Sequence, residues 1–285
     1  MPKLLVPINL AATLLPIALL TLTTICVAAP DTTAQAAPDT KTAEPQPAPA
    51  GTWETIFEDD FNGATIDTKK WNISAYGRDN AQFVPANIWQ ADGNLVIKTQ
   101  KETFEKYNYT SGGIESKGKM FVHPDNYGGK VRFEVRAKLP KGKGIWPAFW
   151  TLQNEGGWPP EIDIYETLGI NSRIYMTYHW KDVDDGKHKQ NGNAWTPDWD
   201  YSQDFHNYAV VWTKDSLQWE VDGTVRKTLT DPAILAQLKD QYFIIYTQLG
   251  GWDGNWPGDD AVLPAYTYVD WFRASKWVPT PPATK

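Results

Sequence analysis

Cysteine is almost absent from this 285-residue chain, and aspartate and glutamate outnumber lysine and arginine by 34 to 27. The one cysteine, Cys26, lies in an apolar run near the N-terminus that we expect to be removed. The bulky Ile25 before it argues against a lipidated cysteine, which needs small residues there. Without this run the chain has no thiol, which excludes a disulfide and a cysteine-ligated metal site.

A surplus of positive charge is also lacking. The net charge is −7, and it becomes −6 without the first fifty residues, which hold two basic and three acidic side chains. Nucleic acids and anionic membrane surfaces attract basic proteins. We therefore expect neither a nucleic acid nor, once the leader is removed, a membrane as partner.

Charge is absent altogether from residues 4–29, which follow the short basic start "MPK". Small-residue patterns lie at Val27–Ala29 and Ala34–Ala36, as is typical of a secretory signal and its cleavage site. The run is long enough for a membrane anchor, but Pro7 and Pro16 interrupt it, so we favour removal. We predict a signal peptide over residues 1–29 and a secreted or periplasmic protein.

Few apolar side chains occur in residues 30–50, which are rich in alanine, proline and threonine. Such a segment cannot bury enough surface to offset the entropy of ordering it, and we interpret it as a flexible linker. Residues 51–277 have the length of one large all-β domain, and residues 278–285 are predicted to form a flexible tail. We expect this protein to be a monomer.

Tryptophan, in contrast, is abundant, and all fifteen tryptophans follow residue 50. Several lie in loops beside glycine, asparagine and aspartate, as in "NEGGWPP" and "GGWDGNWPGDD". A flat apolar ring beside hydrogen-bonding groups suits a sugar, whose C–H face stacks while its hydroxyls bond. We interpret Trp212 and Trp219, which lie in strand-like runs, as core residues instead.

Apolar or alternating β-rich runs recur along the domain, separated by glycine, proline, asparagine and aspartate. They cover residues 94–99, 129–139, 145–153, 161–168, 173–180, 208–214, 217–223, 241–249 and 266–274. This pattern predicts an all-β fold, a β-jelly roll sandwich of two stacked antiparallel sheets with little helix. Asp222-Gly223 predicts a tight hairpin turn, and residues 231–240 predict one short helix, capped by Thr230 or Asp231, with Pro232 in its first turn.

One strand-like run, "EIDIYE" at residues 161–166, contains three acids among apolar residues. Side chains alternate along a strand, so Glu161 and Asp163 share a face while Glu166 points the other way. A retaining glycoside hydrolase needs two carboxyl groups only about 5 to 5.5 Å apart. A bulge of one residue at Ile164-Tyr165 would bring all three acids to one face.

Crowded acids also raise at least one pKa, as a general acid near neutrality requires. Asp163, lying between the two glutamates, is placed to share a proton or a hydrogen bond with Glu161 and orient it. Two other interpretations of the run stay open. Alternating carboxylates can hold Ca²⁺, and the strand face can simply be solvated.

The run resembles the E-x-D-x-x-E signature of glycoside hydrolase family 16, whose members are β-jelly rolls that cleave β-glucans or marine galactans with retention. The resemblance covers about residues 53–275. It includes "FEDDFNG" followed by "WN", "YGGKVRFEVRAKLPKGKGIWPAFWTLQ", "FHNYAVVWTKDSLQWEVDG" and "YVDWFRA". The combination of these segments is specific, whereas each alone is weak.

The resemblance implies Glu161 as nucleophile, Asp163 as its helper and Glu166 as acid/base, with no cofactor for catalysis. It implies a polysaccharide-binding cleft lined by Trp146, Trp158, His179, Gln248 and Trp252, to which Asn87 and Trp89 are added as candidates from a nearby loop. It also implies a structural Ca²⁺ held by Asp270 with backbone carbonyls near Asp60 and Gly93.

Two positions depart from the family pattern. Gly113 stands where laminarin-cleaving relatives often have arginine, and Pro160 precedes the motif where they often have "GE". The leading hypothesis is a secreted, endo-acting retaining hydrolase of β-1,3- or mixed β-1,3-1,4-glucans. The alternatives are a hydrolase of a sulfated or marine galactan (carrageenan, agarose or porphyran) and a non-catalytic carbohydrate-binding module.

Overall fold

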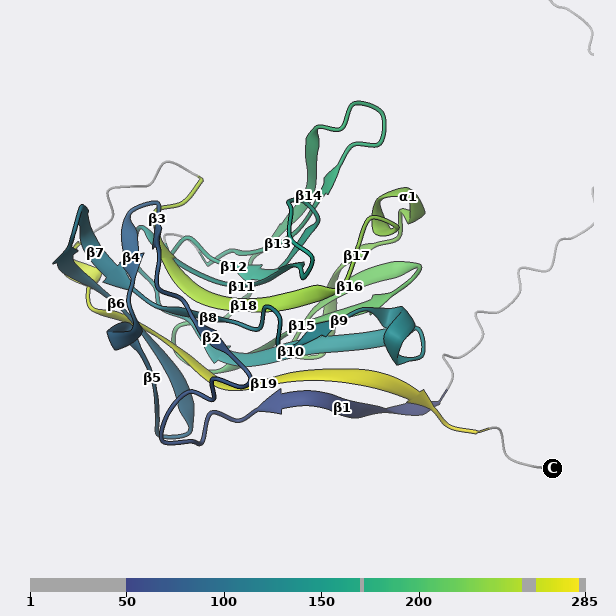
Figure 1. Ribbon diagram of the computed structural model, residues 1–285, viewed down its shortest axis with the longest axis horizontal. Helices are drawn as coiled ribbons and strands as arrows, with labels where there is room; N and C mark the ends of the chain where they lie inside the picture. Colours follow the sequence, from purple (N-terminus) through teal and green to yellow (C-terminus); the bar gives the residue numbers. More distant parts are fainter. Residues whose placement is uncertain (1–49, 170–171, 253–259, 282–285) are drawn as a thin grey trace, which may run out of the picture. The chain divides into compact units, whose positions relative to one another are not determined.

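The computed structural model describes residues 50–169, 172–252 and 260–281, and these fold into two stacked sheets (Figure 1). Within them the first sheet has 11 strands, in the order β17-β16-β15-β10-β19-β6-β7-β4-β3, with β1 beside β19 and β5 beside β6. The second has 8 strands, in the order β14-β13-β12-β11-β18-β8-β2, with β9 beside β18. Apart from the parallel β4–β7 pair, the recorded pairings are antiparallel, so the predicted sandwich is confirmed.

The strands of the first sheet are β1 (Gly51–Asp59), β3 (Gly77–Arg78), β4 (Ala81–Phe83), β5 (Ile88–Ala91), β6 (Asn94–Phe104), β7 (Tyr107–Ser111), β10 (Lys130–Lys138), β15 (His206–Thr213), β16 (Ser216–Val221), β17 (Thr224–Leu229) and β19 (Ala265–Pro279). Those of the second are β2 (Asn72–Ile73), β8 (Gly113–Glu115), β9 (Phe121–Val122), β11 (Ile145–Gln153), β12 (Glu161–Glu166), β13 (Ile174–Lys181), β14 (His188–Trp195) and β18 (Gln241–Leu249). Short 3₁₀ turns lie at Pro85–Asn87, Pro124–Tyr127 and Asp260–Val262.

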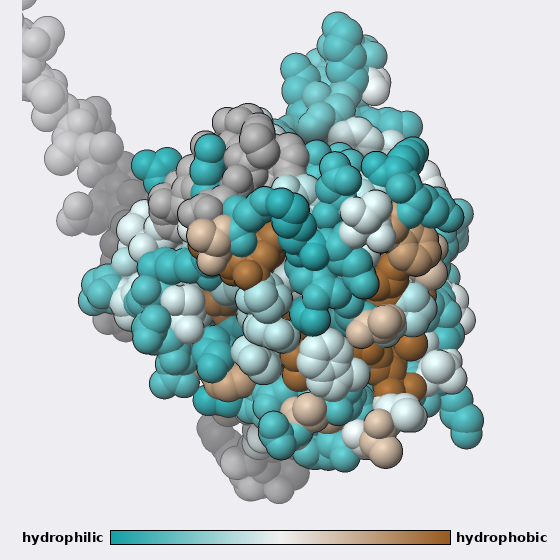
Figure 2. Space-filling view, turned by 90° about the vertical axis from the view of Figure 1, so that its left-hand side faces the viewer, coloured by the Kyte–Doolittle hydropathy of each residue, from teal (hydrophilic) through white to brown (hydrophobic). Residues whose placement is uncertain are grey.

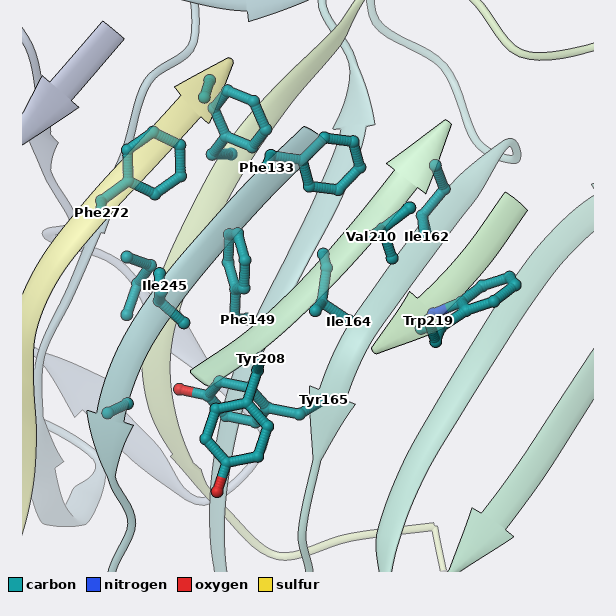
Figure 3. Close-up of a cluster of buried hydrophobic side chains, with 14 of the residues drawn as sticks. Phe133, Phe149, Ile162, Ile164, Tyr165, Tyr208, Val210, Trp219, Ile245 and Phe272 are labelled. Carbon is teal, nitrogen blue, oxygen red and sulfur yellow. The ribbon is translucent and has the colours of Figure 1, made fainter. Parts of the chain in front are cut away.

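The core lies between the two sheets, where alternate residues of facing strands interdigitate (Figure 3). The ring of Phe243 lies 5.3 Å from that of Phe133 and 4.8 Å from that of Phe272, which joins β18 to β10 and β19 across the sandwich. Trp212 and Trp219 are buried in this core, as predicted. Each such side chain contributes roughly 1.5–3 kcal/mol by leaving water.

The predicted hairpin turn and the predicted short helix both form. Asp222 and Gly223 have φ of 50° and 73°, the positive values of the predicted hairpin turn. The predicted helix forms but is shorter than expected: α1 covers only Pro232–Leu235, and Asp231, not Thr230, caps it by accepting a hydrogen bond from Ala233 N.

Strand β14 was not predicted, because its sequence, "HKQNGNAW", neither alternates nor is apolar. It nevertheless pairs with β13 along its whole length, and its first seven residues are exposed. Figure 1 shows the β13–β14 hairpin projecting from the sandwich, and in Figure 2 it is the hydrophilic projection at the top.

Two strands lie near the predicted ends of the domain. Strand β1 begins at Gly51, and β19 continues to Pro279, two residues beyond position 277. Val278 and Pro279 pair with β1, and this pairing orders the start of the predicted tail. The predicted signal peptide and residues 30–49 of the linker lie outside the described residues. No helix in the described ranges is both long enough and apolar enough to cross a membrane.

Candidate active site

The acidic strand β12 contains the predicted bulge. Trp150 of β11 pairs with Asp163, and the next residue back, Phe149, pairs with Tyr165, which leaves Ile164 without a partner. The pairing of β12 with β13 is irregular over the same residues. A bulge inserts one extra residue into a strand and so resets its alternation. The bulge at Ile164-Tyr165 is therefore confirmed.

The bulge sorts the side chains of β12 onto two faces. Three of them point into the core, Ile162, Ile164 and Tyr165, as Figure 3 shows. The other three, Glu161, Asp163 and Glu166, line a cleft of about 490 Å³ on the opposite face. Because Ile164 and Tyr165 both face the core, Glu166 lies on the same face of the strand as Glu161 and Asp163.

Side chains of β3, β11, β12, β13, β14 and β18, together with Trp252, form the cleft. Five of them are aromatic: Trp146, Trp150, Tyr175, Tyr246 and Trp252. Polar groups such as Thr177, Gln190 and Asn193 stand between these rings. A cleft of rings with interspersed polar groups is suited to a flat, hydroxyl-rich ligand.

Glu161 has three close neighbours. The indole Nε1 of Trp158 donates to its Oε2 at 2.6 Å, Asp163 is hydrogen-bonded to it, and His179 Nε2 lies 3.9 Å from its Oε1. Burial and then repulsion by Asp163 raise the pKa of Glu161 to about 8, while His179 opposes this rise. The carboxylate is thus oriented, poorly solvated and reactive once ionised.

Asp163 lies almost fully buried beside it. Nε2 of His179 lies 3.0 Å from Asp163 Oδ2, and Trp219 Nε1 donates to the Asp163 backbone carbonyl at 2.7 Å. Burial raises the pKa of the Asp163 carboxyl and lowers that of His179. The other ring nitrogen of His179 lies 2.8 Å from Nε2 of His188 on β14, so a chain of hydrogen bonds runs from Asp163 to the exposed hairpin.

Glu166 accepts a hydrogen bond from Nε1 of Trp146 at 3.0 Å. Burial, then repulsion by Asp163 and Glu161, raises its pKa well above the usual range. This shift favours the protonated form of the carboxyl, as a general acid requires. Glu161, Asp163 and His179 also bring ligand atoms within 4.8 Å of one another, a spacing that suits a metal ion as well as a catalytic group. The burial of these side chains is inconsistent with a solvated strand face.

The predicted cleft residues on β11, β12 and β13 come together. Trp252 packs edge-on against Trp146 at 5.1 Å and against Tyr175 at 5.2 Å. Trp158 is about half exposed and its ring lies against that of His188, with centroids 4.5 Å apart and planes tilted by 43°. Gln248 pairs with Trp146, but its Nε2 donates to Asp79 Oδ2 at 2.5 Å and its side chain is buried.

Asn87 and Trp89 are not among the residues that line this cleft. Asn87 is buried, and its Nδ2 donates to Thr110 Oγ1 at 2.8 Å. Trp89 lies on β5, opposite Val96 of the first sheet. The side-chain amide joins the 3₁₀ turn Pro85–Asn87 to β7, a tertiary contact that the loop-like sequence did not reveal.

Arg78 is the main cleft residue that sequence reasoning missed. Its guanidinium lies over Trp150 and Tyr246, at 5.2 and 5.4 Å from the ring centroids. Gly113, the departure from the family pattern, pairs with Tyr246, and a Cβ there would lie 2.7 Å from Tyr246 Cβ. The cleft therefore has an arginine after all, delivered by β3 rather than by β8.

Asp270 lies where two strands meet the same edge of β19. The β6 pairing ends at Val269 and the β1 pairing begins at Phe272, which brings the backbones next to Asp60 and Gly93 to this point. One carboxylate with backbone carbonyls is a ligand set that suits Ca²⁺. Asp270 Oδ2, however, accepts a hydrogen bond from Arg136 Nη1 at 2.5 Å, so an ion would have to share this carboxylate or displace the guanidinium.

Comparison with known proteins agrees with this geometry. The model of the family described as glycosyl hydrolases family 16 matches residues 77–273. A beta-glucanase of Rhodothermus marinus is 32% identical over 255 residues, covering 79% of this chain and 86% of that protein. The endo-beta-1,3-glucanase structure from Pyrococcus furiosus gives a TM-score of 0.70 at 30% identity, covering 81% of this chain and 97% of that one.

A keratan-sulfate endo-1,4-beta-galactosidase of Sphingobacterium multivorum is 28% identical over 246 residues, covering 79% of this chain and 55% of that protein. The family match spans both sheets and includes the bulged acidic strand. This chain therefore belongs to family 16 of the glycosyl hydrolases.

Proposed function

We propose that this protein is an endo-acting, retaining hydrolase of β-1,3- or mixed β-1,3-1,4-glucans. The observation that carries the proposal is the bulge in β12, which puts two glutamates and an aspartate on one wall of an aromatic cleft. The beta-glucanase of Rhodothermus marinus and the endo-beta-1,3-glucanase of Pyrococcus furiosus, both about one-third identical, support this substrate class.

In the first step, protonated Glu166 donates its proton to the glycosidic oxygen as the bond to the anomeric carbon breaks. The Glu161 carboxylate attacks that carbon from the opposite face and forms a covalent glycosyl ester. The hydrogen bond from Trp158 to Glu161 and that from Trp146 to Glu166 hold the two groups in place for these roles. The leaving sugar departs with the proton.

In the second step, Glu166 is a carboxylate and takes a proton from a water molecule. The hydroxide so formed attacks the anomeric carbon and releases Glu161, so the product keeps the configuration of the substrate. In addition to burial, Asp163 raises the pKa of Glu161 by its charge and by a hydrogen bond, which makes the ionised Glu161 a stronger nucleophile in the first step. His179 fixes Asp163 from the other side.

Arg78 favours a second candidate, hydrolysis of a sulfated or otherwise anionic galactan. A guanidinium binds sulfate by paired, charge-assisted hydrogen bonds, and Arg78 lies in the cleft over two rings. The keratan-sulfate endo-1,4-beta-galactosidase belongs among the relatives. The more similar relatives, a beta-glucanase and an endo-beta-1,3-glucanase, favour the neutral glucan as substrate.

A substrate panel tests both candidates. Reducing-sugar release is measured from laminarin, barley β-glucan, carrageenan, agarose and keratan sulfate, and we expect the two glucans to be cleaved fastest. Glu161→Gln removes the nucleophile, so we expect activity to fall at least about 1,000-fold while laminarin still binds. Release from a galactan alone would reverse the order of the two candidates. Wild-type turnover by Glu161→Gln would contradict the assignment of the nucleophile.

The remaining expectations stand as proposals with this function. The apolar leader supports export to the periplasm or exterior, and no cofactor is needed for the two-glutamate chemistry. We also propose that the protein acts as a monomer on its polysaccharide and that Asp270 holds a structural calcium ion.

A further inference from the structure

Lys227 on β17 is a buried cation that the proposed chemistry does not use. Its side chain crosses from the first sheet to the second, where Nζ donates to Met176 O on β13 at 2.9 Å and to Asn191 O on β14. The residue is only 8% exposed, and no carboxylate in the described ranges forms an ion pair with it. The ammonium therefore bonds backbone oxygens alone.

The position of these two carbonyls relates Lys227 to the cleft. Met176 and Asn191 flank the cross-strand pair Thr177–Gly192, with Thr177 directly between Met176 and Tyr178. Thr177 and Gly192 both line the cleft. The ammonium thus joins β13 to β14 from the core side, directly behind the cleft wall.

Apart from its pairing with β13, strand β14 is held by Trp195 at its end, which packs against the core. Seven of its eight residues are exposed, so burial of its side chains contributes little. It nevertheless supplies Gln190, Gly192 and Asn193 to the cleft. A strand that forms a binding wall without a buried face needs a polar anchor if the wall is to keep its place.

Lys227 also connects this wall to the acidic strand. Its Nζ lies 4.2 Å from the ring centroid of Trp219, and Trp219 Nε1 donates to the backbone carbonyl of Asp163. Burial lowers the pKa of Lys227 to about 8, and the charge of Asp163 opposes the fall. An apolar residue would avoid the cost of burying this charge, so stability alone does not account for a lysine here.

From this geometry we propose that Lys227 is a positioning residue that fixes β14 as one wall of the substrate cleft. The inference rests on the proposed function only in taking the cleft as the site where a polysaccharide binds. The ammonium donates to Met176 O and Asn191 O and to neither glutamate, so Lys227 acts on substrate binding through these two carbonyls.

Lys227→Met keeps the length of the side chain and removes its donors. With laminarin, we expect KM to rise about tenfold while kcat stays within about threefold, because binding is lost without loss of transition-state chemistry. Lys130→Met is the matched control. Its ammonium also lies over a tryptophan, 4.5 Å from Trp277, but at the β1–β19 end of the first sheet, so both constants should remain unchanged.

Lys227→Arg restores donors that reach the same carbonyls, and we expect it to recover at least half of the lost affinity. A Lys227→Met variant with wild-type KM, or an equal rise in Lys130→Met, would overturn the proposal. Circular dichroism at the assay temperature confirms that each variant is folded.

Hydrogen exchange separates this inference from the proposed function. In Lys227→Met, the amides of residues 188–195 should exchange at least about tenfold faster, with the β10–β19 amides unchanged. Unchanged exchange in 188–195 would overturn the positioning role even if the enzyme cleaves glucans. Faster exchange would support it even if every substrate in the panel fails.

Discussion

At the scale of single residues, the site depends on neutral donors placed against crowded acids. The indoles of Trp158 and Trp146 each hold one glutamate without adding a charge, so they orient the acids and only partly offset their raised pKa values. Asp163 supplies the repulsion and His179 opposes it. Burial is the largest cause of the raised pKa of Glu161, and these two neighbours adjust that pKa in opposite directions.

The pH profile follows from these shifts. The nucleophile must be ionised, so activity falls as the pH drops through the raised pKa of Glu161, about 8. We expect the acidic limb of kcat/KM in the neutral to mildly alkaline range rather than near pH 4.5. Rates on laminarin between pH 4 and pH 10 locate this limb, and a limb at pH 4–5 would contradict the assignment.

Two substitutions should move this limb in opposite directions. Asp163→Asn removes a negative charge, lowers the pKa of Glu161 and shifts the limb to lower pH, by about one unit. His179→Ala removes a partner that stabilises the ionised form and shifts the limb to higher pH. Asp215→Asn, in the exposed β15–β16 turn, serves as the control, and shifts of the same sign in both variants would refute the network.

At the scale of the strand, the bulge in β12 sets both the face and the spacing of the acids. Ile164 is the extra residue, and its side chain is used in the core. The sandwich thus gains a buried side chain from the same irregularity that aligns Glu166 with Glu161. The bulge serves packing and the catalytic face at once.

Deleting Ile164 should leave all three acids on one face, because E-I-D-Y-E alternates regularly without a bulge. We expect measurable activity together with a loss of about 2–5 kcal/mol of stability from the missing core side chain. Inserting alanine between Ile164 and Tyr165 also keeps parity but moves Glu166 roughly 6–7 Å along the strand, too far for retention. Denaturant melts and laminarin assays on both variants test this, and an active insertion variant would disprove it.

At the scale of the whole molecule, the edge of β19 is where β1 and β6 meet, and the proposed calcium site would join them. At this edge the Asp270 carboxylate also forms an ion pair with Arg136. An ion bound only to the folded state raises stability by mass action. We expect 5 mM CaCl₂ to raise Tm and EDTA to lower it by several degrees, with little change in initial rate.

Asp270→Asn is the matched variant, in which the response to calcium should disappear. Melting curves by scanning fluorimetry with and without EDTA give the comparison. An identical response of Tm in the wild type and in Asp270→Asn would remove Asp270 from the site.

The sequence by itself determined nine of the strands (β6, β10, β11, β12, β13, β15, β16, β18 and β19), the hairpin turn at Asp222-Gly223, the burial of Trp219 and the face of the three acids. Each of these depends on alternation or on the φ angle of one residue, which are local properties. The bulge is a further feature that the sequence determined, because a regular strand would have put Glu166 on the opposite face from Glu161.

Only the tertiary structure decided the rest of the site. Arg78 enters the cleft because β3 folds over Trp150 and Tyr246, Asn87 leaves it because Thr110 binds its amide, and β14 exists because β13 pairs with it. Lys227 reaches the cleft wall from the opposite sheet. These contacts join residues far apart in the chain, and no local pattern encodes a partner supplied by another strand.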